Sequence, residues 1–406
     1  MKKISGNPYL KINEKEFLVD QVNLDDLIEK YQTPFMVFIE NRIKDNLKSF
    51  NQVFNSHFEN FKGYYSIKAN YLQSICEMIN NENFGAEIIS LPELKLCQKI
   101  GFKSENIIIG GPYLPKNLIK ESLLNSVNEI IVYDLDDIKR IDTLAREYGK
   151  IQNICIRINS MKYMSKLGVT INHNNVKILS KLLNKCQNIR LSTLTSHYGS
   201  QLNNVDQYLK NLENIVRAIK ILKENGINIK NLNLGGGFPE ATIMPKPQLE
   251  LIAIEIKNFL LSNQIDYDKI IFEPGRYLVG DSGIFISEIT KISDERWIFI
   301  NIGNHICPKF ARCSLRFYNV NRIRSAHKYK TSIAGIVPTD QDVLAKNYFF
   351  TKELRKGDKI LITNVGAYCL TFSNRFPYSL PKILSVKNDE CKEIFNPESD
   401  NDFSLN

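Results

Sequence analysis

Short apolar runs alternate with amphipathic segments through the middle of the chain. Runs of this length are typical of buried strands, and the segments between them have the spacing of helices, as at 203–225 and 247–262. Eight strands alternating with helices predict a closed (β/α) barrel, although periodicity alone leaves an open doubly wound sheet possible. The runs are Phe61–Lys68, Gly85–Ile89, Asn106–Gly110, Glu129–Tyr133, Ile154–Ile158, Leu191–His197, Leu232–Leu234 and Ile270–Glu273.

The pattern changes after Gly283, where strand-like runs follow one another without long helices between them. Residues 1–33 hold further short β-like pieces and one small helix. We therefore expect a barrel over residues 40–283 and a mostly-β second domain made of residues 1–39 and 284–406. The polar tail, 388–406, is expected to fray. The later runs are Ile284–Ile292, Trp297–Ile302, Thr331–Val337 and Asp358–Asn364.

Composition narrows the functional classes. The 406 residues fit one barrel plus a smaller domain. The net charge is +9, but basic and acidic residues are interspersed, so we expect no nucleic-acid partner. No apolar run reaches membrane-spanning length, and no apolar segment follows the basic start. Eight cysteines without a CxxC motif predict reduced thiols in the cytoplasm and no metal site.

Chemically useful side chains stand at the ends of predicted barrel strands, where barrel enzymes place their working residues. Lys68 ends the first run, His197 and Ser200 follow the sixth, and Glu273 ends the eighth. Each has an ordinary structural interpretation. Lys68 could extend into water along an apolar stem, and His197 could be a hydrogen-bonded core residue. Ser200 could cap a helix, and Glu273 could pair with a lysine.

A glycine run, Gly235-Gly236-Gly237, follows the seventh predicted strand, and Arg276 follows the eighth. Glycines let backbone N–H groups approach a phosphate, and a guanidinium binds one with two hydrogen bonds. The alternative is a plain strand-to-helix turn. A dinucleotide fingerprint fits poorly, because Glu240 stands where its third glycine would be. A lysine, a histidine, a carboxylate and a phosphate cradle at one mouth favour a pyridoxal phosphate site.

With these motifs the chain resembles the fold type III pyridoxal-phosphate decarboxylases, which include diaminopimelate, ornithine and arginine decarboxylases. The resemblance implies an alanine-racemase-like barrel and removal of the α-carboxylate from an amino acid or amino-acid conjugate. It runs in family order over nearly the whole chain. Its residues are Tyr65-Ser66-Ile67-Lys68-Ala69-Asn70, Ser90 with Glu93, Arg157, Ser165-Lys166-Leu167-Gly168, His197-Tyr198-Gly199-Ser200-Gln201, Gly235-Gly236-Gly237-Phe238-Pro239, Glu273-Pro274-Gly275-Arg276 and Gly366-Ala367-Tyr368.

The resemblance also implies individual roles. Lys68 would form the aldimine with the cofactor, His197 would stack on its ring, and Glu273 would contact the pyridine nitrogen. The enzyme would be a homodimer with two shared active sites. The phosphate would be held by Ser200, Gly235, Gly236, Gly237, Arg276 and Tyr368.

One loop departs from the family pattern. The family's partner-subunit loop begins with a cysteine and an acid and reaches an aspartate four positions after the cysteine. Here the segment is Pro338-Thr339-Asp340-Gln341-Asp342, so Asp342 matches but Pro338 has no side-chain proton to give. We expect Thr339, Asp340 and Asp342 to form the substrate loop. Cys307 and Cys313 are candidate replacements for the missing proton donor, although structural thiols are the more ordinary interpretation. Water could also supply the proton, or the enzyme could have changed or lost its reaction.

Several functions remain compatible with these residues. Thr339 and the loop Gly110-Gly111-Pro112 resemble the siderophore and antibiotic branch, whose members act on conjugated amino acids. A diaminopimelate, ornithine or lysine decarboxylase of primary metabolism is the first alternative, and a racemase or oxidative decarboxylase is another. Pro338 also allows a non-catalytic paralogue that binds a protein partner. Retention of Lys68, His197 and Glu273 argues against that last possibility.

Overall fold

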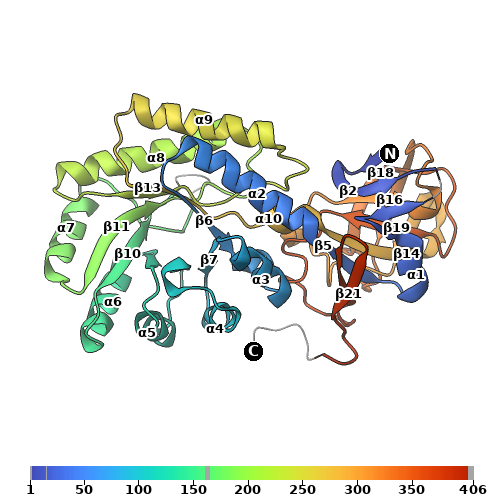
Figure 1. Cartoon of the computed structure of the whole chain (residues 1–406), viewed down its shortest axis with the longest axis horizontal. Coiled ribbons are helices and arrows are strands. Elements are labelled where there is room, and N and C mark those ends of the chain that lie inside the picture. The colour runs from blue at the N-terminus through green and yellow to red at the C-terminus, as the bar shows by residue number, and fades with distance from the viewer. Residues whose placement is uncertain (1, 15, 161–164, 401–406) are drawn as a thin grey trace. The chain divides into compact units, whose positions relative to one another are not determined.

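The structure is a computed structural model that describes residues 2–14, 16–160 and 165–400. The chain forms two compact units (Figure 1). Among the described residues, the first comprises Leu47–Pro239 and Met244–Gly275, and the second comprises the residues up to Asn46, the short segment Glu240–Ile243 and residues 276–400.

The first unit contains a closed barrel of eight parallel strands in the order β10-β11-β12-β13-β6-β7-β8-β9. Closure comes from pairing of β13 with β6, so the barrel prediction is confirmed and the open-sheet alternative is wrong. The strands are β6 Phe61–Ser66, β7 Gly85–Ile88, β8 Ile107–Ile109, β9 Glu129–Val132, β10 Gln152–Arg157, β11 Ile189–Thr195, β12 Asn231–Asn233 and β13 Lys269–Phe272.

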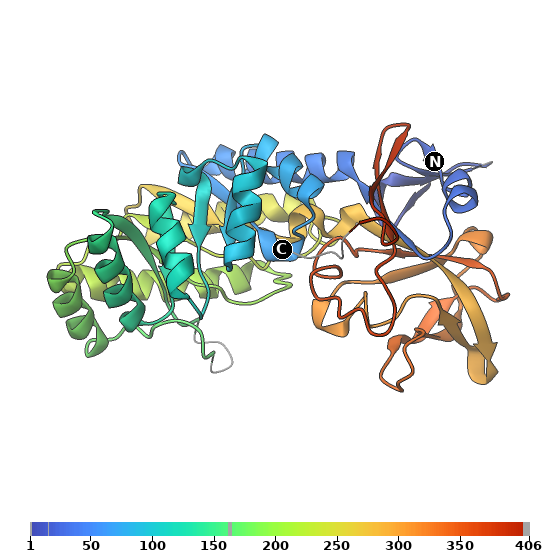
Figure 2. The ribbon, with the colours of Figure 1, turned by 90° about the horizontal axis from the view of Figure 1, so that it is seen from below.

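Helices follow the strands and surround the barrel (Figures 1 and 2). Leu212, Ile215 and Ile219 of α8 are buried at helical spacing, which explains how its apolar stripe covers the sheet. A capping box of Asn204 and Gln207 starts that helix. The helices are α2 Glu40–His57, α3 Gln73–Asn81, α4 Leu91–Ile100, α5 Lys116–Leu124, α6 Leu135–Glu147, α7 Asn175–Lys185, α8 Val205–Glu224 and α9 Lys246–Ser262.

An aromatic cluster anchors the glycine run to the barrel wall. Phe238 directly follows Gly237, and its ring lies 5.1 Å from that of Phe50 and 5.4 Å from that of Phe272. Phe50, Phe238 and Phe272 are all buried. Because buried aromatic pairs pack closely, the backbone next to Phe238 has little freedom to move.

The second unit is mostly β. Its larger sheet runs in the order β18-β17-β15-β14-β5-β20-β21, with β16 and β19 paired beside β14, and β1 to β4 form a separate antiparallel sheet. The helices are α1 Leu24–Lys30 and α10 Arg276–Val279. The strands are β1 Lys2–Ile4, β2 Asn7–Ile12, β3 Phe17–Val19, β4 Val22–Asn23, β5 Phe35–Ile39, β14 Gly283–Ser293, β15 Trp297–Ile300, β16 Arg316–Asn319, β17 Tyr329–Ala334, β18 Val343–Phe350, β19 Lys359–Thr363, β20 Lys382–Lys387 and β21 Glu390–Phe395.

The N-terminal segment is part of this unit, because β5 pairs with both β14 and β20. The expectation of a frayed tail is wrong for β21, which pairs with β20. Polar residues dominate β21 because it is an edge strand with a largely exposed face. Residues 401–406 lie outside the described residues. Within the described parts of the chain, no helix is both long and apolar enough to cross a membrane.

Candidate active site

Lys68 lies just beyond strand β6, in a 3-10 turn formed by Ile67–Ala69. Its Nζ donates to Oε2 of Glu87 on β7 at 2.5 Å, and Ser66 Oγ donates to the same oxygen at 2.5 Å. Glu87 is buried, whereas 38% of the Lys68 side chain is exposed. The amine is thus oriented by a fixed carboxylate and stays accessible. Glu87 was given no role in the sequence analysis.

Glu273 directly follows β13 and is partly buried. Burial and the negative charge of Glu87 raise its pKa to about 7, against the opposing charge of Lys68. Oε1 accepts a hydrogen bond of 2.7 Å from Asn233 Nδ2. Lys68, Glu87 and Glu273 therefore act on one another electrostatically, and Glu273 can carry a proton near neutral pH.

His197 contacts the glycine run. The Gly236 N–H donates to His197 Nδ1 at 3.3 Å, so this nitrogen is the acceptor and the neutral ring carries its proton on Nε2. The Gly235 N–H donates to Asn233 Oδ1 at 3.0 Å. Asn233 therefore bridges the glycine run and Glu273. Sequence reasoning missed Asn233, although the alternation Asn231-Leu232-Asn233-Leu234 could have indicated an inward polar side chain.

The glycines are required by close packing. A Cβ added to Gly236 would lie 2.3 Å from the backbone oxygen of Glu273, and one on Gly237 would lie 2.2 Å from the oxygen of Gly199. Gly235 and Gly237 also have positive φ, at 68° and 95°. The run therefore brings the backbone against two neighbouring strand ends. Its role in holding a phosphate stays a prediction.

Arg157, the last residue of β10, adds a cation to this group. Its Nη1 donates to the Tyr133 hydroxyl at 2.7 Å, and its guanidinium carbon lies 4.7 Å from the centre of that ring. The charge of Arg157 favours the ionised form of Glu273 and so opposes the rise in its pKa. Ser200 lies exposed in the loop after β11; Asn204, not Ser200, caps the next helix.

The second unit brings Arg276 and Tyr368 together. Arg276 is buried, its Nη1 lies 3.2 Å from Glu240 Oε1, and its Nη2 donates to the Ala311 carbonyl at 2.6 Å. Its guanidinium carbon lies 4.8 Å from the centre of the Tyr368 ring. Tyr368 has a φ of 67°, a strained conformation for a bulky residue. Sequence reasoning noted Glu240 only as the residue replacing a glycine.

The 338–342 loop is held from inside by Asp342. Its buried carboxylate accepts N–H groups from Asn304 at 2.6 Å and from Val337 at 2.7 Å. Pro338, Thr339 and Asp340 are exposed. Within the chain, Asp342 fixes the loop's shape, and Thr339 and Asp340 stand on its surface.

The residues of the barrel mouth fit pyridoxal phosphate by their chemistry. An accessible primary amine suits an aldehyde, and a carboxyl group with a pKa of about 7 suits a basic ring nitrogen. Because glycines carry no side chain, the backbone of a glycine run can approach an anion closely. The cofactor's aldehyde, ring nitrogen and phosphate are thus matched in chemical character by Lys68, Glu273 and the glycine run, respectively.

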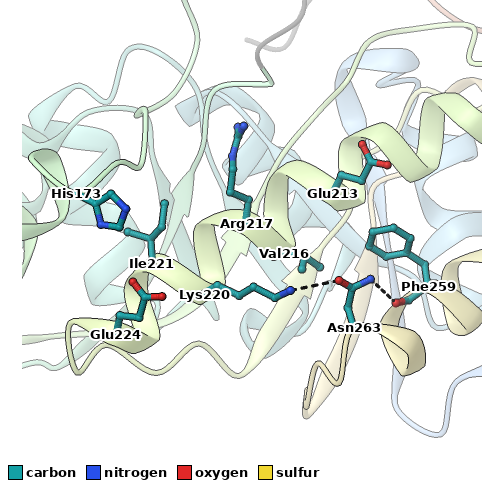
Figure 3. Close-up of a pocket in the computed structure, with 9 residues that line it drawn as sticks. All are labelled: His173, Glu213, Val216, Arg217, Lys220, Ile221, Glu224, Phe259 and Asn263. Atoms are coloured by element: carbon teal, nitrogen blue, oxygen red, sulfur yellow. Dashed lines mark hydrogen bonds between the residues drawn. The ribbon is translucent and has the colours of Figure 1, made fainter.

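A separate hollow of about 500 Å³ lies against the outer helices α8 and α9 (Figure 3). It is lined by charges of both signs, including Glu213, Lys220 and Glu224, and Lys220 Nζ donates to Asn263 Oδ1 at 3.3 Å. Lys220 and Glu224 lie in the C-terminal half of α8, Glu213 lies near its middle, and His173 comes from the turn before α7. The hollow contains none of the predicted site residues.

A family model described as pyridoxal-dependent decarboxylase, pyridoxal binding domain, matches residues 40–280. The chain is 26% identical over 395 residues to diaminopimelate decarboxylase of Aquifex aeolicus, covering 91% of this chain and 90% of the relative. It is 23% identical over 413 residues to diaminopimelate decarboxylase of Staphylococcus aureus, with coverage of 96% and 97%. The crystal structure of diaminopimelate decarboxylase from M. jannaschii matches with a TM-score of 0.88 at 23% identity, covering 98% and 96%. At that identity the structural match shows the fold alone.

Proposed function

The chain belongs to the pyridoxal-dependent decarboxylases, and from that premise we propose which residues hold the cofactor and which amino acid is the substrate. It is a pyridoxal-phosphate-dependent carboxy-lyase that acts on an amino acid. When bound, the cofactor supplies an aldehyde that captures an amine and a ring that accepts the electron pair left by carbon dioxide.

Lys68 is proposed to bind the cofactor covalently through Nζ. The support is its contact with Glu87, which orients the amine, together with its accessible side chain. Glu87 also accepts from Ser66, so the carboxylate is held from two directions. This preorganisation lowers the entropic cost of bringing the amine to a reacting carbon.

Glu273 is proposed to hold a proton at the ring nitrogen, and His197 to lie on the ring face. A carboxyl group whose pKa is about 7 can share its proton with a basic nitrogen, and the resulting carboxylate stabilises the positive ring. Asn233 fixes the Glu273 carboxyl, and Gly236 fixes the His197 ring through Nδ1. The single observation that carries the proposal is this chain of contacts at one barrel mouth.

The phosphate is proposed to be held by Ser200, the glycine run 235–237, Arg276 and Tyr368. The buried pairing of Arg276 with Glu240 supports a positioning role for that carboxylate, because it restricts the guanidinium.

Diaminopimelate is the proposed substrate, because the relatives that match over more than nine-tenths of the chain carry that name. A conjugated amino acid is the second candidate. It is favoured by Pro338 and Thr339, which replace the cysteine and acid of the family loop. Ornithine and lysine carry a free distal ammonium. They differ from diaminopimelate because they lack a second carboxylate, and from a conjugated amino acid because their distal amine is not acylated.

The assembly is proposed to be a homodimer with shared active sites, located in the cytoplasm. Thr339, Asp340 and Asp342 of one protomer would complete the site of its partner. The division into a cofactor-binding barrel, 40–283, and a β domain, 1–39 and 284–406, belongs to this proposal. So does the absence of nucleic-acid and membrane partners. Sedimentation together with complementation between Lys68→Ala and Asp340→Ala protomers would test the shared site.

Carbon dioxide release from a substrate panel tests the function. The panel contains diaminopimelate, lysine, ornithine and N-acylated diamino acids, with products identified by mass spectrometry. We expect the highest kcat/KM with diaminopimelate and no release by Lys68→Ala. Lys220→Ala is the matched control, since Lys220 lies in the outer hollow of Figure 3. No release from any compound by cofactor-loaded protein would contradict the proposal.

A further inference from the structure

Three cysteine sulfurs meet inside the second unit. Cys313 Sγ lies 3.6 Å from Cys369 Sγ, and Cys307 Sγ lies 3.9 Å from Cys369 Sγ. All three are free thiols; Cys307 and Cys369 are buried, whereas Cys313 is partly exposed. Within the described ranges of the chain, no group of three or more His, Cys, Asp or Glu side chains is arranged to hold a metal ion. The short sulfur distances therefore point to thiol chemistry.

The surroundings distinguish Cys313 from Cys369. The Arg276 Nη1 lies 3.7 Å from Cys313 Sγ. The hydrogen bond from Cys369 and the charge of Arg276 outweigh burial and lower the pKa of the Cys313 thiol. The pKa of Cys369 is raised by its hydrogen bonds to Cys307 and Cys313 and by burial. The thiol of Cys313, a partly exposed residue, therefore ionises more readily, and Cys369 keeps its proton.

We propose that Cys313 and Cys369 form a peroxide-reactive dithiol that closes reversibly into a disulfide. The Cys313 thiolate attacks one oxygen of hydrogen peroxide, and the O–O bond breaks. Hydroxide departs, and Cys313 becomes a sulfenic acid. The Cys369 sulfur then displaces the hydroxyl group, which departs as water with the thiol proton. Counting the proton that Cys313 lost, two thiols are oxidised and one peroxide is reduced to two waters.

Bond formation would join two segments that surround Arg276. Cys313 follows Ala311, whose carbonyl accepts from Arg276, and Cys369 follows Tyr368. The sulfurs would approach from 3.6 Å to about 2.05 Å and tie residues that are 56 positions apart. A link across this many residues restricts the unfolded chain and stabilises the unit. The inference concerns the thiols themselves and does not depend on the substrate or on decarboxylation.

Peptide mapping of the intact holoenzyme tests this site. The protein is treated with hydrogen peroxide, free thiols are blocked, and peptides are separated without reductant. We expect a Cys313–Cys369 disulfide that dithiothreitol removes. Cys307→Ser, the matched control, should form the same bridge. In Cys369→Ser the resolving thiol is missing, so dimedone should label Cys313.

The thermal unfolding midpoint provides a second measurement. The oxidised protein should unfold several degrees above the reduced protein, and dithiothreitol should reverse the shift. The proposal would be overturned by peroxide-treated wild type without this bridge, by a bridge through Cys307, or by a folded Cys369→Ser protein in which dimedone does not label Cys313. Mapping of the wild type decides the matter even where a variant fails to fold.

Discussion

Gly236→Ala should weaken cofactor binding, because it would disturb the glycine run together with Glu273 and His197. The new Cβ would lie 2.3 Å from the Glu273 backbone oxygen, and ordinary contact begins at 3.4 Å, so the loop must move by about 1 Å. That movement stretches the 3.3 Å hydrogen bond from Gly236 to His197. Loss of one or two hydrogen bonds corresponds to about 1–3 kcal/mol, or roughly tenfold to a hundredfold in affinity.

The assay is equilibrium titration of apo-protein with pyridoxal phosphate, followed by absorbance. Gly226→Ala is the matched control, because Gly226 has a φ of 76° but nothing within 4 Å of an added Cβ. That variant should lose about 1 kcal/mol of folding stability and keep its cofactor affinity. Wild-type affinity in a folded Gly236→Ala protein, or an equal loss in Gly226→Ala, would refute the reasoning.

Two further predictions concern buried carboxyl groups. Burial raises the pKa of Glu129 from 4.5 to about 7. The raised pKa therefore does not lower the free energy of unfolding below pH 4.5, and lowers it progressively between pH 4.5 and pH 7. In urea unfolding, the free energy of unfolding of Glu129→Gln relative to that of the wild type should therefore rise by about 3 kcal/mol between pH 4.5 and pH 8. A difference that stays constant with pH would contradict this. Asp342→Ala leaves the N–H groups of Asn304 and Val337 without their carboxylate, so stability should fall by about 3 kcal/mol. Asp342→Asn, which keeps one acceptor oxygen, should lose less in the same measurement.

The barrel was predictable because its strands are short, fully buried and regularly separated by amphipathic helices. The run Ile107–Ile109 and the stripe of α8 show this directly. Strand β21 was missed because an edge strand with an exposed face carries the polar composition of a tail. Lys68 was predicted at the end of a strand and lies one turn further on, in a 3-10 turn that periodicity cannot detect.

The candidate site was only partly predictable. The glycine run, Lys68 and Glu273 stand out because their residue types are unusual at barrel strand ends. Asn233 and Glu87 act through contacts that join different strands. One sequence does not give the register between β6 and β7 or between β12 and β13. The cysteine cluster has the same origin. Cys307, Cys313 and Cys369 look unrelated along the chain and meet only when the β unit folds.

Covalent attachment of the cofactor to Lys68 is the most direct test of the account. Holoenzyme is reduced with borohydride, digested and mapped by mass spectrometry. The account predicts a pyridoxyl group on Lys68 and loss of the cofactor's absorbance band in Lys68→Ala. A pyridoxyl group on another lysine, or an unchanged band in Lys68→Ala, would contradict it.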